Sequence, residues 1–160
     1  MRAETQYKSD AISPVGAVGL MQLMPYTAEK IGKMLNEKSQ TQELCKSQKS
    51  IEYGTAYLKK LSLELDYQKP LVAAAYNGGP HRVKQWLKNL GQMDYDIFIE
   101  HIPFAETRTY TKRVLTFRSM YEKIYNGNLA FDKMKYLIEK IPFVVPENFK
   151  LSEEWEFTLK

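Results

Sequence analysis

The sequence predicts an α-helical domain built from short and medium helices, and two observations carry that prediction. Two stretches repeat apolar residues at steps of three and four, the period of a helix with one buried face. The alternation of apolar and polar residues that is typical of strands is hardly visible before residue 140. The two stripes are Ile51, Gly54, Leu58, Leu61 and Leu65, and Tyr110, Val114, Phe117, Tyr121 and Ile124.

Three shorter helices are expected outside these stripes. Proline is favoured in the first turn of a helix, and Pro25 and Pro70 therefore predict helices over residues 25–35 and 70–76. A stripe over residues 83–90 predicts another helix, closed by Gly91 in the left-handed conformation. Loops are expected where helix breakers cluster, at Ser13-Pro14 with Gly16 and Gly19, at residues 77–80, and at Ile102-Pro103.

The length of 160 residues fits one compact domain with a terminal extension. We expect the domain to cover residues 1–127 and the extension, whose role is open, to cover residues 128–160. Within the extension, residues 129–141 predict one more helix. The proline-rich run 142–149 is expected to lie extended on the surface, because proline is unsuited to a central strand.

Composition and charge exclude several classes of protein. Apolar residues make up 44% and charged residues 26%, as in soluble globular proteins, so the chain is expected to fold. The net charge is +4, but Lys and Arg are scattered among Asp and Glu, without the basic arm or stripe of a nucleic-acid partner. We expect no nucleic-acid binding, and a mildly basic surface would equally suit an anionic cell-wall polymer.

No metal, cofactor or membrane span is expected. Cys45 is the sole cysteine, so an intrachain disulfide is impossible and the paired cysteines of zinc or redox sites are absent. The Asp-rich spacing of an EF-hand calcium loop is missing as well. The sequence contains no run of about 18 apolar residues, and residues 1–10 lack the apolar core of a secretory signal.

Some features of the sequence indicate a function only when they are considered together. Glu4 by itself is typical of a solvated surface charge. The run GLMQLMP by itself suits a helix with a methionine-rich core face, and AAAYNGGP suits a buried helix that ends at Asn and Gly. The order and spacing of the runs RAETQY, SPVGAVGLMQLMP, AAYNGGP and IPFAETRTY over about 110 residues are far more specific than any one of them.

On the basis of these four runs, the sequence over roughly residues 2–125 resembles the soluble lytic transglycosylases, whose fold is related to goose-type lysozyme. The resemblance implies a lysozyme-like helical domain around a glycan-binding groove, with Glu4 as the single catalytic acid and base. Such an acid needs a partly desolvated pocket that keeps it protonated. It would protonate the glycosidic oxygen, after which the muramyl 6-hydroxyl, deprotonated by the same glutamate, would close a 1,6-anhydro ring.

The resemblance also implies a set of substrate-binding residues. Ser13 matches the serine near the catalytic glutamate, and the groove-lining motif matches Met21, Gln22 and Met24. Tyr76 and Asn77 match residues that face the sugar, although Asn77 suits a helix C-cap equally well. Glu106 matches a glutamate that helps to build the groove, and its neighbour Arg108 suits a structural role. Tyr110 matches the last motif, but its place in the apolar stripe favours a packing role.

The chain departs from the family pattern at its start. Thr5 stands where the family has serine and Tyr7 where it has Phe or Trp, and both replacements keep the type of group. Relatives place the glutamate near the end of a long helix, whereas three residues precede Glu4 here, and so short a helix is not self-supporting. We expect Met1 to be internal to a longer protein with further domains upstream.

Three functional hypotheses follow from these observations. The first is a peptidoglycan lytic transglycosylase that cleaves the bond between N-acetylmuramic acid and N-acetylglucosamine in the cell envelope or periplasm, a location inferred from the substrate. The second is a hydrolytic lysozyme of the same fold, which needs a second carboxylate, with Asp10 as the nearest candidate in sequence. The third is an inactive glycan-binding module, in which the short start has displaced Glu4.

Overall fold

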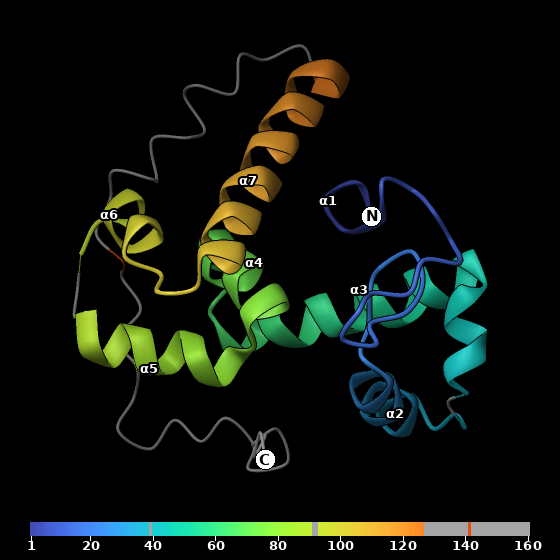
Figure 1. The fold of residues 1–160 in the computed structure, drawn as a ribbon. Coiled ribbons are helices and arrows are strands. Elements are labelled where there is room, and N and C mark those ends of the chain that lie inside the picture. The colour runs from blue at the N-terminus through green and yellow to red at the C-terminus, as the bar shows by residue number, and fades with distance from the viewer. Residues whose placement is uncertain (39, 91–92, 127–140, 142–160) are drawn as a thin grey trace. The chain divides into compact units, whose positions relative to one another are not determined.

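The computed structural model describes residues 1–38, 40–90, 93–126 and 141, and its regular elements are helices (Figure 1). The described chain forms two compact units, one from residue 1 to 60 and one from residue 61 onward. The predicted α-helical class is confirmed. The elements are α1 (Arg2–Thr5), α2 (Pro25–Met34), the 3-10 helix η1 (Thr41–Cys45), α3 (Ser47–Glu64), α4 (Lys69–Gly78), α5 (Pro80–Leu90), α6 (Tyr95–Glu100) and α7 (Ala105–Asn126).

The first unit holds α1, α2, η1 and the beginning of α3. As predicted, α2 begins at Pro25, and it buries Ala28 and Ile31 completely. Leu44 of η1 and Tyr53 of α3 complete this core with at most 1% of their surface exposed. Packing of these side chains stabilises the unit, and full burial of Ile31 and of Leu44 is each worth about 1.5–3 kcal/mol.

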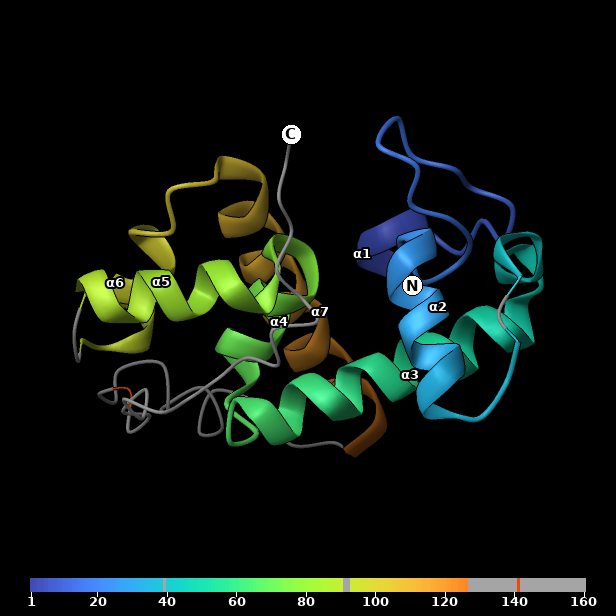
Figure 2. The same cartoon turned by 90° about the horizontal axis from the view of Figure 1, so that it is seen from below.

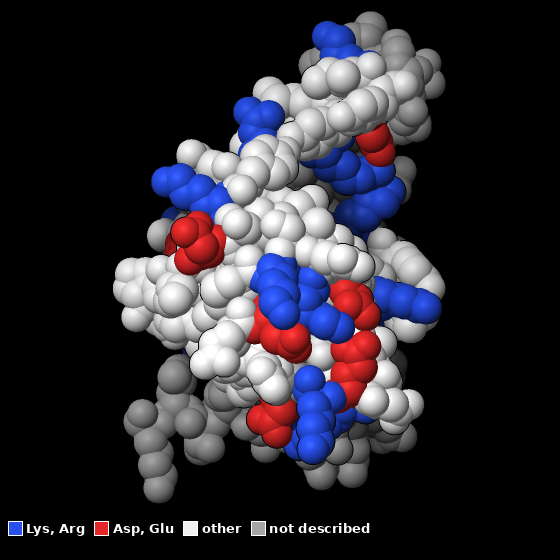
Figure 3. Space-filling model, turned by 90° about the vertical axis from the view of Figure 1, so that its right-hand side faces the viewer, with Lys and Arg blue, Asp and Glu red and all other residues white. Residues whose placement is uncertain are grey.

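Ion pairs on the first unit join opposite charges on its surface. Lys49 of α3 contacts Glu37 at 2.7 Å and Glu52 at 2.9 Å, and the Tyr53 hydroxyl donates to Glu37 at 3.1 Å. Hydrogen bonds from Lys49 and then from Tyr53 hold the pKa of Glu37 below its usual range. Acidic and basic side chains are intermixed on the face in Figure 3, so the scattered charge pattern of the sequence persists in the structure. Exposed pairs of this kind contribute little stability.

The second unit is organised around α4, which contacts both α5 and α7, while α6 contacts α7 (Figures 1 and 2). The central residues of α4, 71–75, are all buried, and three of them are alanines. On α7 the most deeply buried residues are Thr107, Thr111 and Leu115. Small side chains on both facing helices allow close approach of their backbones.

The predicted buried stripe of α7 is only partly correct. The helix itself is confirmed, but Ile124 of the stripe is 70% exposed, and Tyr110 is half-buried. The deeply buried face instead carries two threonines, whose hydroxyl groups are satisfied by hydrogen bonds. An apolar pattern misses such a face because threonine counts as polar in the sequence and is buried only where it finds a partner.

The end of α4 and two short elements differ from the prediction. The loop expected from residue 77 begins later, because α4 continues through Gly78 and is capped by Gly79 at φ 88°. Asn77 therefore lies inside the last turn and is not the C-cap. The short helices η1 and α6 were not predicted. Gly91 and most of the predicted extension 128–160 lie outside the described residues. Within that extension, Ile141 is buried, and its amide donates to the Met93 carbonyl at 3.0 Å.

Candidate active site

Glu4 lies on α1, a helical turn of four residues, and is half-buried. The amides of Glu4 and Thr5 donate to the Met1 carbonyl at 3.1 and 2.9 Å. The chain then reverses through Gln6 and Tyr7, both of which have positive φ. So short a turn cannot persist on its own backbone bonds, and a tertiary contact must hold it.

Thr5 supplies that contact. Its side chain is 8% exposed, and its hydroxyl donates to the Leu20 carbonyl at 3.2 Å, inside the run GLMQLMP. The family pattern has serine at this position, and either residue offers the same hydroxyl. The residue next to Glu4 therefore fastens the turn that carries the glutamate to the loop with the second motif.

The electrostatic surroundings of the turn involve the first residue. Burial lowers the pKa of the Met1 amino group, and attraction by Glu4 partly opposes that shift. The amine also approaches the Met21 sulfur at 3.7 Å. Glu4 thus lies close enough to the Met1 amino group for the two charges to attract each other.

Ser13 and Gln22 stabilise the loop of residues 11–24. The Ser13 hydroxyl accepts a hydrogen bond from the Ala17 amide at 2.9 Å. Gln22 has a left-handed φ of 50°, and its amide nitrogen donates to the carbonyls of Ala11 at 3.0 Å and Gly19 at 2.9 Å. Both side chains therefore have structural roles in the loop, beside the binding roles that the resemblance implies.

Met21 and Met24 differ in exposure. Met21 is 7% exposed, its amide donates to the Ser50 hydroxyl at 3.0 Å, and its side chain lies against Gly54 of α3. Met24 is half-buried and is the N-cap residue of α2. Met21 thus supports the loop from its inner side, whereas Met24 remains accessible.

Gly54 is expected to tolerate a side chain better when Met21 is shortened. A Cβ at position 54 would lie 2.7–2.8 Å from Met21 side-chain atoms, including its Cβ. Gly54→Ala should therefore destabilise the protein by about 1–3 kcal/mol through overpacking. In a Met21→Ala background the same change should destabilise the protein less, because the contacts with the Met21 Cγ and Cε atoms are gone and only the contact with the Cβ at 2.8 Å remains. Urea unfolding of the four proteins measures both effects, and an equal loss in the two backgrounds would contradict the contact.

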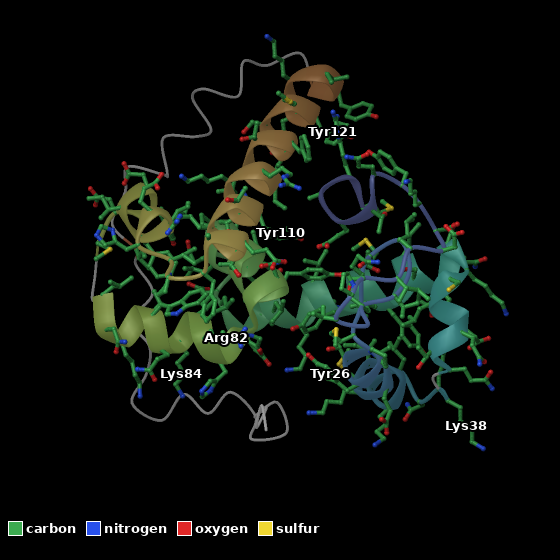
Figure 4. The ribbon with its side chains drawn as sticks, viewed as in Figure 1. Tyr26, Lys38, Arg82, Lys84, Tyr110 and Tyr121 are labelled. Atoms are coloured by element: carbon green, nitrogen blue, oxygen red, sulfur yellow. The ribbon has the colours of Figure 1, made fainter. Side chains whose placement is uncertain are left out.

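The second unit brings two of the predicted binding residues together at the start of α7. The Asn77 amide nitrogen lies 3.4 Å from the Glu106 carboxylate, and the Asn77 oxygen accepts from the Thr107 hydroxyl at 2.7 Å. Tyr76 precedes Asn77 on α4 and is half-buried. Tyr110 follows Glu106 by one turn on the first half of α7 (Figure 4).

Several supporting residues were missed by sequence reasoning. Ser50 and Thr107 are buried polar residues outside the apolar stripes. Thr5 is buried as well, and in the sequence it stands out only because the family has serine at its position. Arg108 behaves as predicted, since its guanidinium donates to the Ile102 carbonyl at 2.9 Å and so holds the chain before α7. A single Ser or Thr is too common in sequences to have singled out the others.

Asp10, the candidate second carboxylate, is exposed on the loop after α1. Among the described residues, no group of three or more His, Cys, Asp or Glu side chains could hold a metal ion. In the same part of the chain, no helix is both long enough and apolar enough to cross a membrane.

Known proteins resemble this chain in sequence and in structure. Soluble lytic murein transglycosylases of Escherichia coli K12 and Salmonella typhimurium are 41% and 40% identical over 123 residues, or 75% of this chain. The X-ray structure of an inactive glutamate-to-glutamine mutant of the lytic transglycosylase Slt of Pseudomonas aeruginosa superposes with a TM-score of 0.74 at 41% identity. That match covers 78% of this chain and 20% of the other.

The chain spans about a fifth of the length of these relatives, 19% of each of the two sequences. The family described as the transglycosylase SLT domain matches residues 1–99, which include Glu4, the run GLMQLMP and the run AAYNGGP. Sequence, fold and family match agree, and the resemblance inferred from four motifs is confirmed. This chain belongs to the transglycosylase SLT domain family.

Proposed function

We propose that this domain is a peptidoglycan lytic transglycosylase in which Glu4 is the single general acid and base. The observation that carries the proposal is the attachment of α1 to the loop of the second motif, through the buried Thr5 hydroxyl and the Leu20 carbonyl. This bond gives the short turn around Glu4 a fixed support, as a catalytic carboxyl requires. Relatives named soluble lytic murein transglycosylases support the same activity.

The proposed reaction needs no water and no second carboxylate. Protonated Glu4 donates its proton to the glycosidic oxygen as the bond to the muramyl C1 breaks, and the leaving sugar gains a 4-hydroxyl. The muramyl O6 then bonds to C1 while the Glu4 carboxylate takes the O6 proton, which returns the glutamate to its starting form. The products are a free glucosaminyl end and a 1,6-anhydromuramyl end.

The remaining predicted residues serve binding in this proposal. Ser13 would lie near the acetamido group of the muramyl sugar, and the groove would be lined by Gln22 and Met24, with Met21 behind them. Tyr76, Asn77, Glu106 and Tyr110 would contact the glycan from the second unit. Such a reaction takes place where peptidoglycan is found, so we place the protein in the cell envelope or periplasm.

Mass spectrometry of glycan fragments released from purified peptidoglycan sacculi tests the reaction type. The proposed lyase should release muramyl ends that are one water lighter than hydrolysed ends. Reducing muramyl ends that disappear in Asp10→Asn would instead establish a lysozyme with two carboxylates. Binding to sacculi without any released fragment would support an inactive glycan-binding module and overturn the proposed activity.

A further inference from the structure

Thr107 is a buried polar residue without a role in the proposed reaction. Its side chain is 4% exposed, although it follows the exposed Glu106 directly on the first turn of α7. Its hydroxyl donates to the Asn77 side-chain oxygen at 2.7 Å, across from α7 to α4. A short bond between two side chains on different helices, 30 positions apart, fixes one side chain against the other.

The two neighbours of Asn77 determine the orientation of its amide. The Glu106 oxygen at 3.4 Å is the acceptor, so the amide atom of Asn77 that faces it is the nitrogen. The amide oxygen therefore faces Thr107, whose hydroxyl must be the donor. If the amide flipped, the oxygen would face a carboxylate and both groups would be acceptors. Thr107 and Glu106 thus hold the amide from two sides.

The packing of α4 on α7 brings the Thr107 side chain close to the backbone of Gly78. A Cβ on Gly78, the residue after Asn77, would lie 3.0 Å from both the Cγ2 and the Oγ1 atom of Thr107. It would also lie 3.2 Å from the Trp86 ring. The absence of a side chain at Gly78 therefore allows the approach on which the bond between Thr107 and Asn77 depends.

We propose that Thr107 is a positioning residue for glycan binding. Because the Asn77 side-chain oxygen accepts a hydrogen bond from the Thr107 hydroxyl, the amide nitrogen stays beside the Glu106 carboxylate. Asn77 and Glu106 together then offer one donor and one acceptor to the same ligand atom. A sugar hydroxyl has that complement, since it accepts from the amide and donates to the carboxylate. The inference rests on the proposed function, because it names how the second unit holds a sugar of the same strand.

A buried threonine one turn farther along provides a matched control. Thr111 is fully buried on the same face of α7, but its hydroxyl donates to the Thr107 carbonyl of its own helix at 2.8 Å. Thr107→Val and Thr111→Val each remove one buried hydroxyl with little change in shape. Only the first removes a bond to Asn77. Thr107→Ser keeps the hydroxyl and should restore the wild-type behaviour.

The first measurement observes the Asn77 side-chain amide by NMR, with Asn77→Ala to assign its two proton resonances. We expect those resonances to shift and to exchange faster with water in Thr107→Val, and to stay near their wild-type values in Thr107→Ser and Thr111→Val. Equal spectra in Thr107→Val and wild type would overturn the inference. This readout does not depend on any enzymatic activity.

The second measurement is co-sedimentation with purified sacculi, made in a Glu4→Gln background so that the strands stay intact. The sacculi concentration for half-maximal binding should rise about tenfold in Thr107→Val and stay within about threefold in Thr107→Ser and Thr111→Val. In an Asn77→Ala background, Thr107→Val should have no further effect. An equal loss in Thr111→Val, or an additive loss without Asn77, would show a general packing defect and overturn the positioning role.

The two proposals can fail separately. If the wild-type protein releases no anhydromuramyl ends while the binding series follows the expected order, the positioning role is supported and the lyase reaction is overturned. If anhydromuramyl ends form and Thr107→Val binds like wild type, the reaction is supported and the positioning role is overturned.

Discussion

Replacing Glu4 with glutamine should lower the rate of glycan cleavage by at least about 1,000-fold, within the range of roughly 100- to 10,000-fold that general acid and base catalysis contributes. Glutamine has nearly the same shape but cannot give up a proton to the glycosidic oxygen or take one from the 6-hydroxyl. Because Thr5 still bonds to the Leu20 carbonyl, the turn should stay in place. The measurement is the initial rate of fragment release from sacculi.

Glu29→Gln is the matched control for that substitution. Glu29 is an exposed carboxylate on α2 that pairs with Lys33 four residues later. Its loss removes the same charge from the same unit without touching α1, so the cleavage rate should stay within about twofold of wild type, as expected for an exposed ion pair. If the Glu4→Gln protein retained a tenth or more of the wild-type rate, Glu4 would not be the catalytic acid and base.

Gly19→Ala should be the most damaging substitution for stability. Gly19 has a φ of +77°, and a Cβ there would lie 1.9 Å from the Leu44 carbonyl oxygen and 2.8 Å from its carbon. Those atoms belong to the backbone and cannot rotate away. Conformational strain of about 1–3 kcal/mol adds to overpacking of a similar size, so we expect a loss of about 2–5 kcal/mol in the free energy of unfolding.

Gly16→Ala separates the two causes. Gly16 has a φ of +88°, but a Cβ there would meet no atom within 4 Å. The change should therefore lower the free energy of unfolding only through the strain of the left-handed conformation, by about 1–2 kcal/mol. Urea unfolding of the two variants compares them directly. Equal losses in the free energy of unfolding would mean that the close approach of Gly19 to Leu44 of η1 does not affect stability.

The sequence predicts the longer elements of this fold because each carries a clear signal. Pro25 marks the first turn of α2, and α3 has a stripe long enough to exclude a strand. The 3-10 helix η1 and α6 have neither feature. Their residues Leu44 and Phe98 are fully buried, and burial of that kind depends on neighbours that are distant in sequence. Tertiary packing, rather than local preference, decides such short helices.

The candidate site was predictable only where whole motifs could be compared. The resemblance supplied Glu4 and the eight binding candidates, whereas composition and periodicity alone favoured ordinary surface and core roles for them. The buried hydroxyl groups that support the site, those of Thr5, Ser50 and Thr107, could not be predicted. Their importance follows from single hydrogen bonds to partners 15 to 30 residues away, and no pattern in the sequence marks such pairs.

Cleavage of sacculi in water enriched in oxygen-18, followed by borohydride reduction, tests the central claim that Glu4 acts without water. A hydrolase places one labelled oxygen on each new muramyl end, which borohydride then reduces to an alcohol. The account predicts ends that carry no label and resist reduction, because the sugar's own O6 has closed the ring. Labelled and reducible muramyl ends would contradict it and would require a second catalytic group that activates water.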